Sequence, residues 1–230
     1  MPRMLQPALA CDTTPPSTVP RPLALWGLWL AAILAIGPFI VRRIVLIGDD
    51  DYAHWMAVDT LARCTSLIGV ALGFRTGLLQ RAQPRADWPR SLRIFLLLLA
   101  AEYVEQTIGA PVLQHYFRFA ETTAWPPIPD FSLRMADLSA GLLFAVLVEE
   151  VVFRKFLFAL VERWTARQVP VIAISATTFA LIHFTSGVVD TMLNALVHGI
   201  FLGLAYAATR RLSICVASHY LVDFLIFAGR

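Results

Sequence analysis

The sequence predicts an all-α, polytopic integral membrane protein with about seven transmembrane helices, between six and eight. The 230 residues are 58% hydrophobic and only 15% charged. Their mean hydropathy of +0.67 lies outside the range of ordinary soluble domains. Apolar stretches recur along the chain, and the clearest of them approaches the roughly 20 residues that a helix needs to cross a bilayer.

The first predicted span is the uncharged run from Leu23 to Val41. Further apolar stretches follow at 56–79, 92–110, 136–160, 169–185, 190–209 and 212–229. The second of the seven is the least apolar because it carries Asp59, Arg63 and Arg75. No internal repeat and no separate soluble domain interrupts this series, so residues 23–230 are expected to form a single helical membrane domain.

The segments outside the spans are polar or rich in proline. Residues 1–22 are predicted to be a disordered cytoplasmic tail. The first span lacks a small-x-small cleavage site, which favours a retained helix over a signal peptide. The only long connection, 111–134, contains Trp125, Pro126, Pro127 and Pro129 and is expected to lie at the membrane interface. Cysteines 64 and 215 fall in predicted spans and, like Cys11, show no CxxC spacing, so we expect them to pack as small apolar groups.

The net charge of +3 comes almost wholly from arginines, which in a membrane protein report the orientation of the loops. No nucleic-acid partner is expected. If the N-terminus is cytoplasmic, the cytoplasmic loops collect Arg21, Arg81, Arg85, Arg90, Arg163, Arg167, Arg210 and Arg211. The opposite side collects fewer: Arg42, Arg43, Arg118, Arg134 and Arg230. This bias predicts a multi-pass protein of the cell (inner) membrane with its C-terminus opposite the cytoplasm, although Arg42 and Arg43 contradict it. The single lysine among many arginines is typical of a GC-rich bacterial genome.

Charged residues inside a span are costly and indicate function. In LVEEVVFRKFLF, residues 147–158, Glu150 and Arg154 are four apart on a helix and can pair. Glu149 points about 100° away from Glu150 and is expected to lack that partner. One carboxylate then looks structural and the other available for chemistry. The alternative is that all three residues form a buried ionic staple between helices.

Two histidines extend this pattern to other spans. Phe179 and His183 lie one turn apart, and His219 and Asp223 share a face at i and i+4, where the carboxylate can orient the imidazole. Each alone could be a packing residue. Glu149, His183 and His219 nevertheless lie inside different predicted helices at compatible depths, which predicts one site buried in the membrane.

Such a site suits hydrolysis of a peptide bond without a covalent intermediate. A desolvated glutamate can take a proton from water and return it to the leaving amine. Neighbouring imidazoles can position that water or stabilise an oxyanion. Ser175 and Ser218 lack a partner at helical spacing, and a pairing of Cys215 with His219 is a minor alternative. Two histidines and a carboxylate also allow zinc, with Glu149, His183 and His219 as ligands. No HExxH is present, and a mechanism without any cofactor is favoured over one with zinc.

In this order EExxxR, FxxxH and HxxxD resemble the CAAX-protease and bacteriocin-processing family of intramembrane proteases, over residues 136–230. The resemblance implies that Glu149 is the catalytic base, supported by Glu150, Arg154 and Phe179. It also implies that His183 and His219 orient water and stabilise the oxyanion. Many family members have asparagine at the fourth position, where this chain has Asp223. An ionised aspartate donates no hydrogen bond, so Asp223 must be protonated or act on His219.

Other polar residues within the spans are expected to have lesser roles. Asn194 and His198 lie four residues apart beside Gly199 and Gly203. They either line a substrate cavity or form hydrogen bonds between closely packed helices, the second being favoured. Glu102 and Glu105 are expected to be interhelical partners.

These observations favour an intramembrane endopeptidase that cuts near the membrane face. Its expected partners are the lipid bilayer and a membrane-associated peptide or protein, for example the C-terminal tail of a membrane-anchored or exported protein. The alternative is a proteolytically silent membrane scaffold or a bacteriocin-immunity-type protein. A transporter would be expected to show an inverted repeat, and none is visible.

Overall fold

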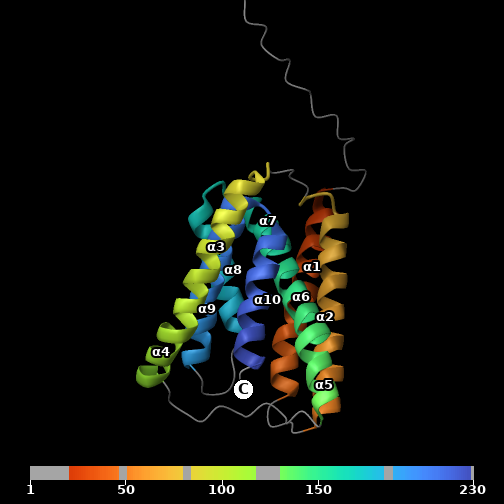
Figure 1. The fold of residues 1–230 in the computed structure, drawn as a ribbon. Helices are drawn as coiled ribbons and strands as arrows, with labels where there is room; N and C mark the ends of the chain where they lie inside the picture. The colour runs from red at the N-terminus through yellow and green to blue at the C-terminus, as the bar shows by residue number, and fades with distance from the viewer. Residues whose placement is uncertain (1–20, 47–50, 80–83, 118–129, 184–188, 229–230) are drawn as a thin grey trace, which may run out of the picture.

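The computed structural model describes residues 21–46, 51–79, 84–117, 130–183 and 189–228, and every regular element within them is helical (Figure 1). The elements in chain order are α1 (Arg21–Val45), α2 (Tyr52–Arg75), α3 (Trp88–Val104), η1 (Glu105–Gly109), α4 (Ala110–Phe117), α5 (Phe131–Ala136), η2 (Asp137–Gly141), α6 (Leu142–Glu150), η3 (Val151–Phe156), α7 (Leu157–Glu162), α8 (Gln168–Ile182), α9 (Val189–Thr209) and α10 (Leu212–Ala228). The predicted all-α class is confirmed.

Several elements follow one another without a break, so the described residues form seven continuous helical stretches, as predicted. Elements α3 to α4 make one stretch, 88–117, and α5 to α7 make another, 131–162. The start of α1 and the end of α10 lie at opposite ends of the bundle (Figure 1). Within the described residues, four helices are long and apolar enough to cross a membrane: Ala24–Val45, Tyr52–Arg75, Trp88–Leu113 and Thr191–Thr209. Elements α8 and α10 are shorter apolar helices.

Some predictions fall outside the described residues. These include nearly all of the predicted N-terminal tail, the aromatic middle of the 111–134 connection, Cys11, and three of the arginines used for orientation: Arg81, Arg118 and Arg230. The 111–134 connection is helical at both ends, since α4 continues to Phe117 and α5 begins at Phe131. The orientation in the membrane therefore stays a prediction.

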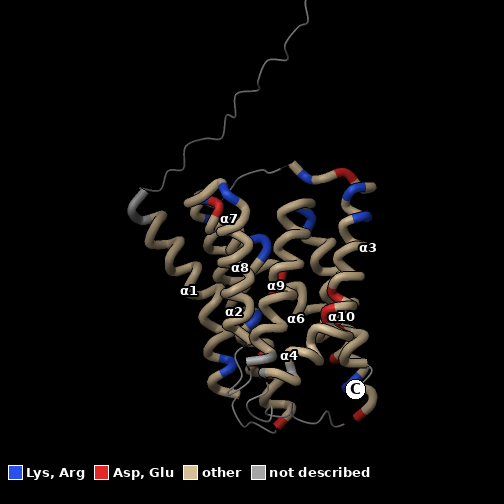
Figure 2. Tube along the Cα trace, turned by 90° about the vertical axis from the view of Figure 1, so that its left-hand side faces the viewer, with Lys and Arg blue, Asp and Glu red and all other residues tan. Residues whose placement is uncertain are grey.

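Two of the three π-helical segments in the described residues lie beside buried carboxylates. Element η1 begins at Glu105, three residues after the fully buried Glu102, and η3 begins directly after Glu149 and Glu150. A π-turn adds a residue to the helical repeat and is frequent at functional sites. Figure 2 shows acidic and basic segments in the middle of the bundle as well as at its ends. Several charged residues of the spans are buried in its interior, among them Glu102, Glu149, Glu150 and Arg154.

Close packing of α1 against α2 depends on small residues. Ala31 and Ala35 on α1 are fully buried. They face Gly69 on α2, where an added Cβ would overlap backbone atoms of Leu34 and Ala35. Gly73, one turn later, faces the ring of Phe156 in η3. Small residues let two helix backbones approach closely within a membrane, so α1 and α2 form a tight pair that contacts the helix of the two glutamates.

Three apolar clusters of buried residues occur in the described part of the chain, and two of them are larger than the third. The larger joins α1, α2, η3 and α8 and contains Phe39, Phe153, Phe156 and Phe179. The smaller joins α3, α9 and α10 around Leu202 and includes Cys215, which packs as predicted. Cys64 is instead exposed on the outside of α2, so the prediction that it packs in the interior is wrong. The reason is that apolar residues surround it on all sides of its helix, so the sequence does not show which face turns inward.

Replacing Gly69 by alanine tests the α1–α2 contact. Because the new Cβ must displace backbone, we expect the free energy of unfolding in detergent to fall by about 1–3 kcal/mol. Gly27→Ala is the matched control, since its Cβ would meet only Thr76 Cγ2 at 3.6 Å, an ordinary contact. Equal stability of the two variants would contradict the packing described.

Candidate active site

The two adjacent glutamates close α6, and both turn into the bundle. Glu149 is 6% exposed and Glu150 is fully buried. The Nε atom of Arg154 lies 3.2 Å from Oε2 of Glu150, so the predicted pair at i and i+4 is confirmed. Arg154 is itself fully buried. This pair places a positive and a negative charge at the centre of an apolar bundle.

Further contacts hold Arg154 in place. Its Nη1 donates to Ser175 Oγ at 2.8 Å, and Ser175 Oγ donates to the carbonyl of Phe153 at 2.9 Å. The guanidinium carbon lies 5.2 Å from the centre of the Phe179 ring, within the range of a cation–π contact. Ser175 therefore anchors an arginine, and its hydroxyl proton is already donated to the backbone.

Glu149 does not pair with Arg154, as expected, but it pairs with a second arginine that the three sequence motifs do not include. Arg63 of α2 donates from Nη1 to Glu149 Oε1 at 2.8 Å and to the carbonyl of Ala145 at 3.0 Å. Its Nε donates to Asp59 Oδ2 at 2.7 Å. Helical spacing within one segment cannot reveal a partner that comes from a distant helix. The available signal was Asp59 and Arg63 themselves, an acid and a base four residues apart inside an apolar stretch.

The two arginines that contradict the loop-charge bias also point into the protein. Arg42 is 3% exposed and forms a hydrogen-bonded ion pair with Asp59. Arg43 donates from Nε to the carbonyl of Ile182 at 3.0 Å. Both residues belong to the last turn of α1 rather than to a loop. Contacts within the bundle therefore explain the positions of both arginines. The loop-charge rule applies to loop residues and so does not apply to them.

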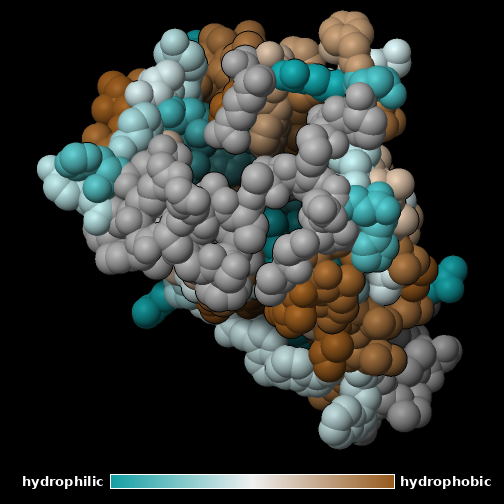
Figure 3. Space-filling view, turned by 90° about the horizontal axis from the view of Figure 1, so that it is seen from below, coloured by the Kyte–Doolittle hydropathy of each residue, from teal (hydrophilic) through white to brown (hydrophobic). Residues whose placement is uncertain are grey.

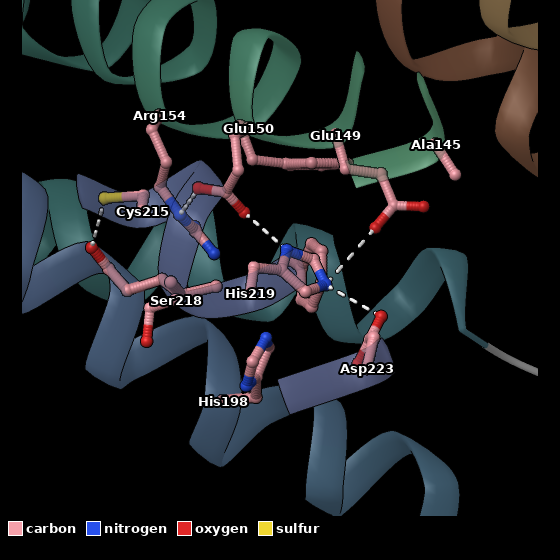
Figure 4. Close-up of polar contacts among 12 residues, drawn as sticks. Ala145, Glu149, Glu150, Arg154, His198, Cys215, Ser218, His219 and Asp223 are labelled. Atoms are coloured by element: carbon pink, nitrogen blue, oxygen red, sulfur yellow. Dashed lines mark hydrogen bonds and ion pairs between the residues drawn. The ribbon is translucent and has the colours of Figure 1, made fainter. Parts of the chain in front are cut away.

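His219 of α10 lies at the centre of three carboxylates (Figure 4). Its Nδ1 is 3.0 Å from Glu150 Oε1, and its Nε2 is 3.3 Å from Asp223 Oδ2 and 4.0 Å from Glu149 Oε2. A histidine that carries both protons can donate from both nitrogens, and this arrangement offers an acceptor to each. Asp223, the most exposed carboxylate of the three, thus contacts His219, which is one of the two roles expected for it.

Phe179 lies between the imidazoles. Its ring centre is 4.5 Å from that of His183, 6.0 Å from that of His219 and 6.1 Å from that of His198. His183 is the C-cap residue directly after α8, and its Nδ1 lies 2.7 Å from the carbonyl of Phe179. Because a carbonyl only accepts hydrogen bonds, Nδ1 carries the proton, and Nε2 is the nitrogen available to a water or a substrate.

His198 and Glu102 extend the site toward α3 and α9, beyond what the sequence motifs indicate. The His198 ring is buried and its centre lies 4.6 Å from that of His219. Its Nδ1 is 3.3 Å from Glu102 Oε1, and Ser218 Oγ donates to the other oxygen of that carboxylate at 2.5 Å. Glu102 is thereby an interhelical partner, as predicted.

Asn194 lies one turn before His198 on α9 and contacts a different carboxylate. With its amide nitrogen turned toward Glu105, Asn194 donates to that side chain. Gln106 Nε2 donates to the same carboxylate at 2.8 Å. Of the two residues expected to line a cavity or bridge helices, His198 therefore reaches the histidine cluster and Asn194 bridges α9 to η1.

The sequence left two alternative chemistries open, a Cys215–His219 pair and a zinc site, and the structure bears on them differently. Cys215 Sγ donates to the carbonyl of Leu202 at 3.6 Å and lies away from the His219 ring (Figure 4), which gives no support to a Cys–His pair. In the part of the chain that the structure describes, no group of three or more His, Cys, Asp or Glu side chains is arranged to hold a metal ion. The zinc set Glu149, His183 and His219 is left to experiment.

Seen from the end of the bundle that carries the end of α10, hydrophilic surface is visible in recesses of this face (Figure 3). The side chain of Asp223 is 25% exposed, against 8% for Glu149 and 4% for His219. Access to the site thus decreases from Asp223 through Glu149 to the fully buried Glu150.

Removing the central arginine tests the Glu150–Arg154 pair. Because Arg154→Ala strands a buried carboxylate, we expect the free energy of unfolding in detergent to fall by about 3–5 kcal/mol. Lys155→Ala removes the next cation along the chain, which is exposed and whose Nζ lies 5.6 Å from the centre of the Phe74 ring. That control should lose no more than about 1 kcal/mol. Similar losses in both variants would contradict the pairing.

Comparison with known proteins locates a family within the chain. The model of the family described as "Type II CAAX prenyl endopeptidase Rce1-like" matches residues 131–225. No curated protein and no solved structure matches the chain. The match covers the whole of the predicted EExxxR, FxxxH and HxxxD pattern, and together with the apolar helices it describes a multi-pass membrane protein. The segment from α5 to α10 is therefore related to the Rce1-like CAAX prenyl endopeptidases, a family of proteases, as its three motifs predict.

Proposed function

We propose that the protein is an intramembrane endopeptidase in which Glu149 activates the water that cleaves the peptide bond. One observation carries the proposal: His219 meets Glu149, Glu150 and Asp223 in a buried cluster built from two separate helices. Such clusters are expensive to bury, and this one coincides with the segment that matches a protease family.

Glu149 is suited to be the base because its two oxygens have different surroundings. Arg63 holds Oε1, while Oε2 faces Nε2 of His219 across 4.0 Å. In the proposed reaction Oε2 takes a proton from water as the water oxygen attacks the peptide carbonyl, and the protonated carboxyl later gives that proton to the leaving amine. The peptide C–N bond breaks, and the new carboxylate and amine are the products.

The histidines have complementary parts in this reaction. His183, with Nδ1 committed to the Phe179 carbonyl, presents Nε2 to orient the attacking water. His219, when it carries both protons, provides a positive charge that stabilises the oxyanion of the tetrahedral intermediate. Glu150 and Asp223 contact its two nitrogens and hold the ring in position.

The proposed substrate is a peptide held at the membrane, such as the C-terminal tail of a membrane-anchored or exported protein. The location of the site inside an apolar bundle and the family match support this class. The proposal further takes the protein to lie in the cell membrane with a cytoplasmic N-terminus, and the reaction to need no cofactor. Zinc-dependent hydrolysis is the alternative chemistry.

A proteolytically silent scaffold is the second candidate function, and one observation favours it. The carboxylates of Glu149 and Glu150 are both paired with arginines, as expected of charges that only join helices. A scaffold, however, has no need of three imidazoles around Phe179. An activity measurement separates the two functions.

Cleavage by matched variants in liposomes tests the proposed function. Wild type should cut members of a library of membrane-tethered peptides, with products identified by mass spectrometry. Glu149→Gln should lose activity by at least about 10³-fold because the base is absent, yet stay inserted and monodisperse because glutamine still accepts from Arg63. His183→Ala should behave similarly. Glu162→Gln is the control, a buried glutamate on the same helical stretch that pairs with Arg210 at 2.6 Å.

Retained cleavage in Glu149→Gln would contradict the assignment of the base. Activity that a zinc chelator removes and added zinc restores would favour the metal mechanism. If folded wild type cuts no peptide in the library, the scaffold function gains support.

A further inference from the structure

Two neighbouring arginines near the end of α1 reach two different parts of the proposed active site. Arg42 pairs with Asp59 of α2, and Asp59 accepts from Arg63 at 2.7 Å. Arg63 in turn donates to Glu149 at 2.8 Å. The four side chains alternate in charge from Arg42 to the proposed base, and we call them the arginine–aspartate chain: Arg42, Asp59, Arg63 and Glu149.

The other arginine contacts the helix that carries His183. Arg43 Nε donates to the carbonyl of Ile182 at 3.0 Å, and Ile182 is the last residue of α8, directly before His183. A cation is favoured at a helix C-terminus, where backbone carbonyls lack partners within the helix. This contact fixes the end of α8 from which the His183 ring projects.

The members of the arginine–aspartate chain depend on one another because all of them are buried. Arg42, Asp59, Arg63 and Glu149 are each less than 9% exposed. Removing one member leaves the other three with a net charge in an apolar bundle, which is unfavourable. The tight contact of α1 with α2 at Gly69 holds these two helices together, and therefore keeps Arg42 of α1 close to Asp59 of α2.

Arg63 also fixes the direction of the Glu149 carboxylate. Its Nη1 bonds both Glu149 Oε1 and the carbonyl of Ala145, one turn earlier on the same helix. The carboxylate is thus clamped against its own helix by one oxygen, and the other oxygen is directed toward His219. A base held in this way is placed for reaction before the substrate binds.

We propose that α1 and α2 are a positioning part of the active site, in which the arginine–aspartate chain orients Glu149 and Arg43 fixes the helix end that carries His183. Both helices lie outside residues 131–225, the segment that matches the protease family. The inference rests on the proposed function. It assigns roles to Arg42, Arg43, Asp59 and Arg63, none of which belongs to the three sequence motifs.

Variants at Arg63 test the positioning role through the kinetics of peptide cleavage in liposomes. Arg63→Gln should lower kcat by about 100-fold because the base loses its orientation, while KM changes less than about threefold. Arg63→Lys keeps a cation and should recover activity to within about tenfold of wild type. Arg43→Leu should lower kcat through His183. Arg75→Gln, an exposed arginine on the same helix, is the matched control and should behave as wild type.

Wild-type kcat in a folded Arg63→Gln protein would overturn the proposal, as would equal losses of kcat in the lysine and glutamine variants. Unfolding in detergent tests the Arg63–Glu149 contact without relying on activity. The stability lost by the double variant Arg63→Gln/Glu149→Gln should be smaller than the sum of the single losses. Additive losses would overturn the proposal. If wild type cuts no peptide while the losses are non-additive, the proposed function fails and the placement of Glu149 by α2 stands.

Discussion

Burying the carboxylates of Glu149 and Glu150 side by side in an apolar bundle costs free energy unless each meets a cation. The fold meets this constraint with two arginines from different helical elements, one for each carboxylate. Arg154 comes from the next turn of the same helical stretch, and Arg63 comes from α2. Consequently the N-terminal helix pair is tied to the protease-like segment by charge as well as by packing.

The position of the His219 imidazole also depends on the two buried carboxylates. His219 reaches both glutamates, so its ring is fixed where a base and a developing oxyanion would meet. Phe179 fills the space between three histidine rings and also faces the Arg154 guanidinium. Catalysis through a glutamate-activated water needs a dry, preorganised site, and the buried ion pairs and aromatic packing provide the means to hold one.

The contacts that the sequence predicted are those formed within a single helix. Glu150 with Arg154 and His219 with Asp223 could be predicted because a spacing of four residues places both partners on one face. The partner of Glu149 could not, because Arg63 is 86 residues away along the chain. Spans that are apolar on all sides also do not show which face turns inward. The apolar stretches were therefore enough to predict seven helical stretches, the number found in the described residues. They were not enough to predict that Cys64 is exposed or that Arg42 and Arg43 point inward.

Direct attack by water is the central claim of this account, and trapping of an acyl-enzyme tests it most directly. The measurement is a single turnover of wild type on a cleaved peptide in ¹⁸O-labelled water with added hydroxylamine, followed by mass spectrometry of peptide and enzyme. A glutamate-activated water predicts one ¹⁸O atom in the new carboxylate, no peptide hydroxamate and no acylated enzyme. A hydroxamate product, or an acyl group on a serine or cysteine of the enzyme, would contradict the account.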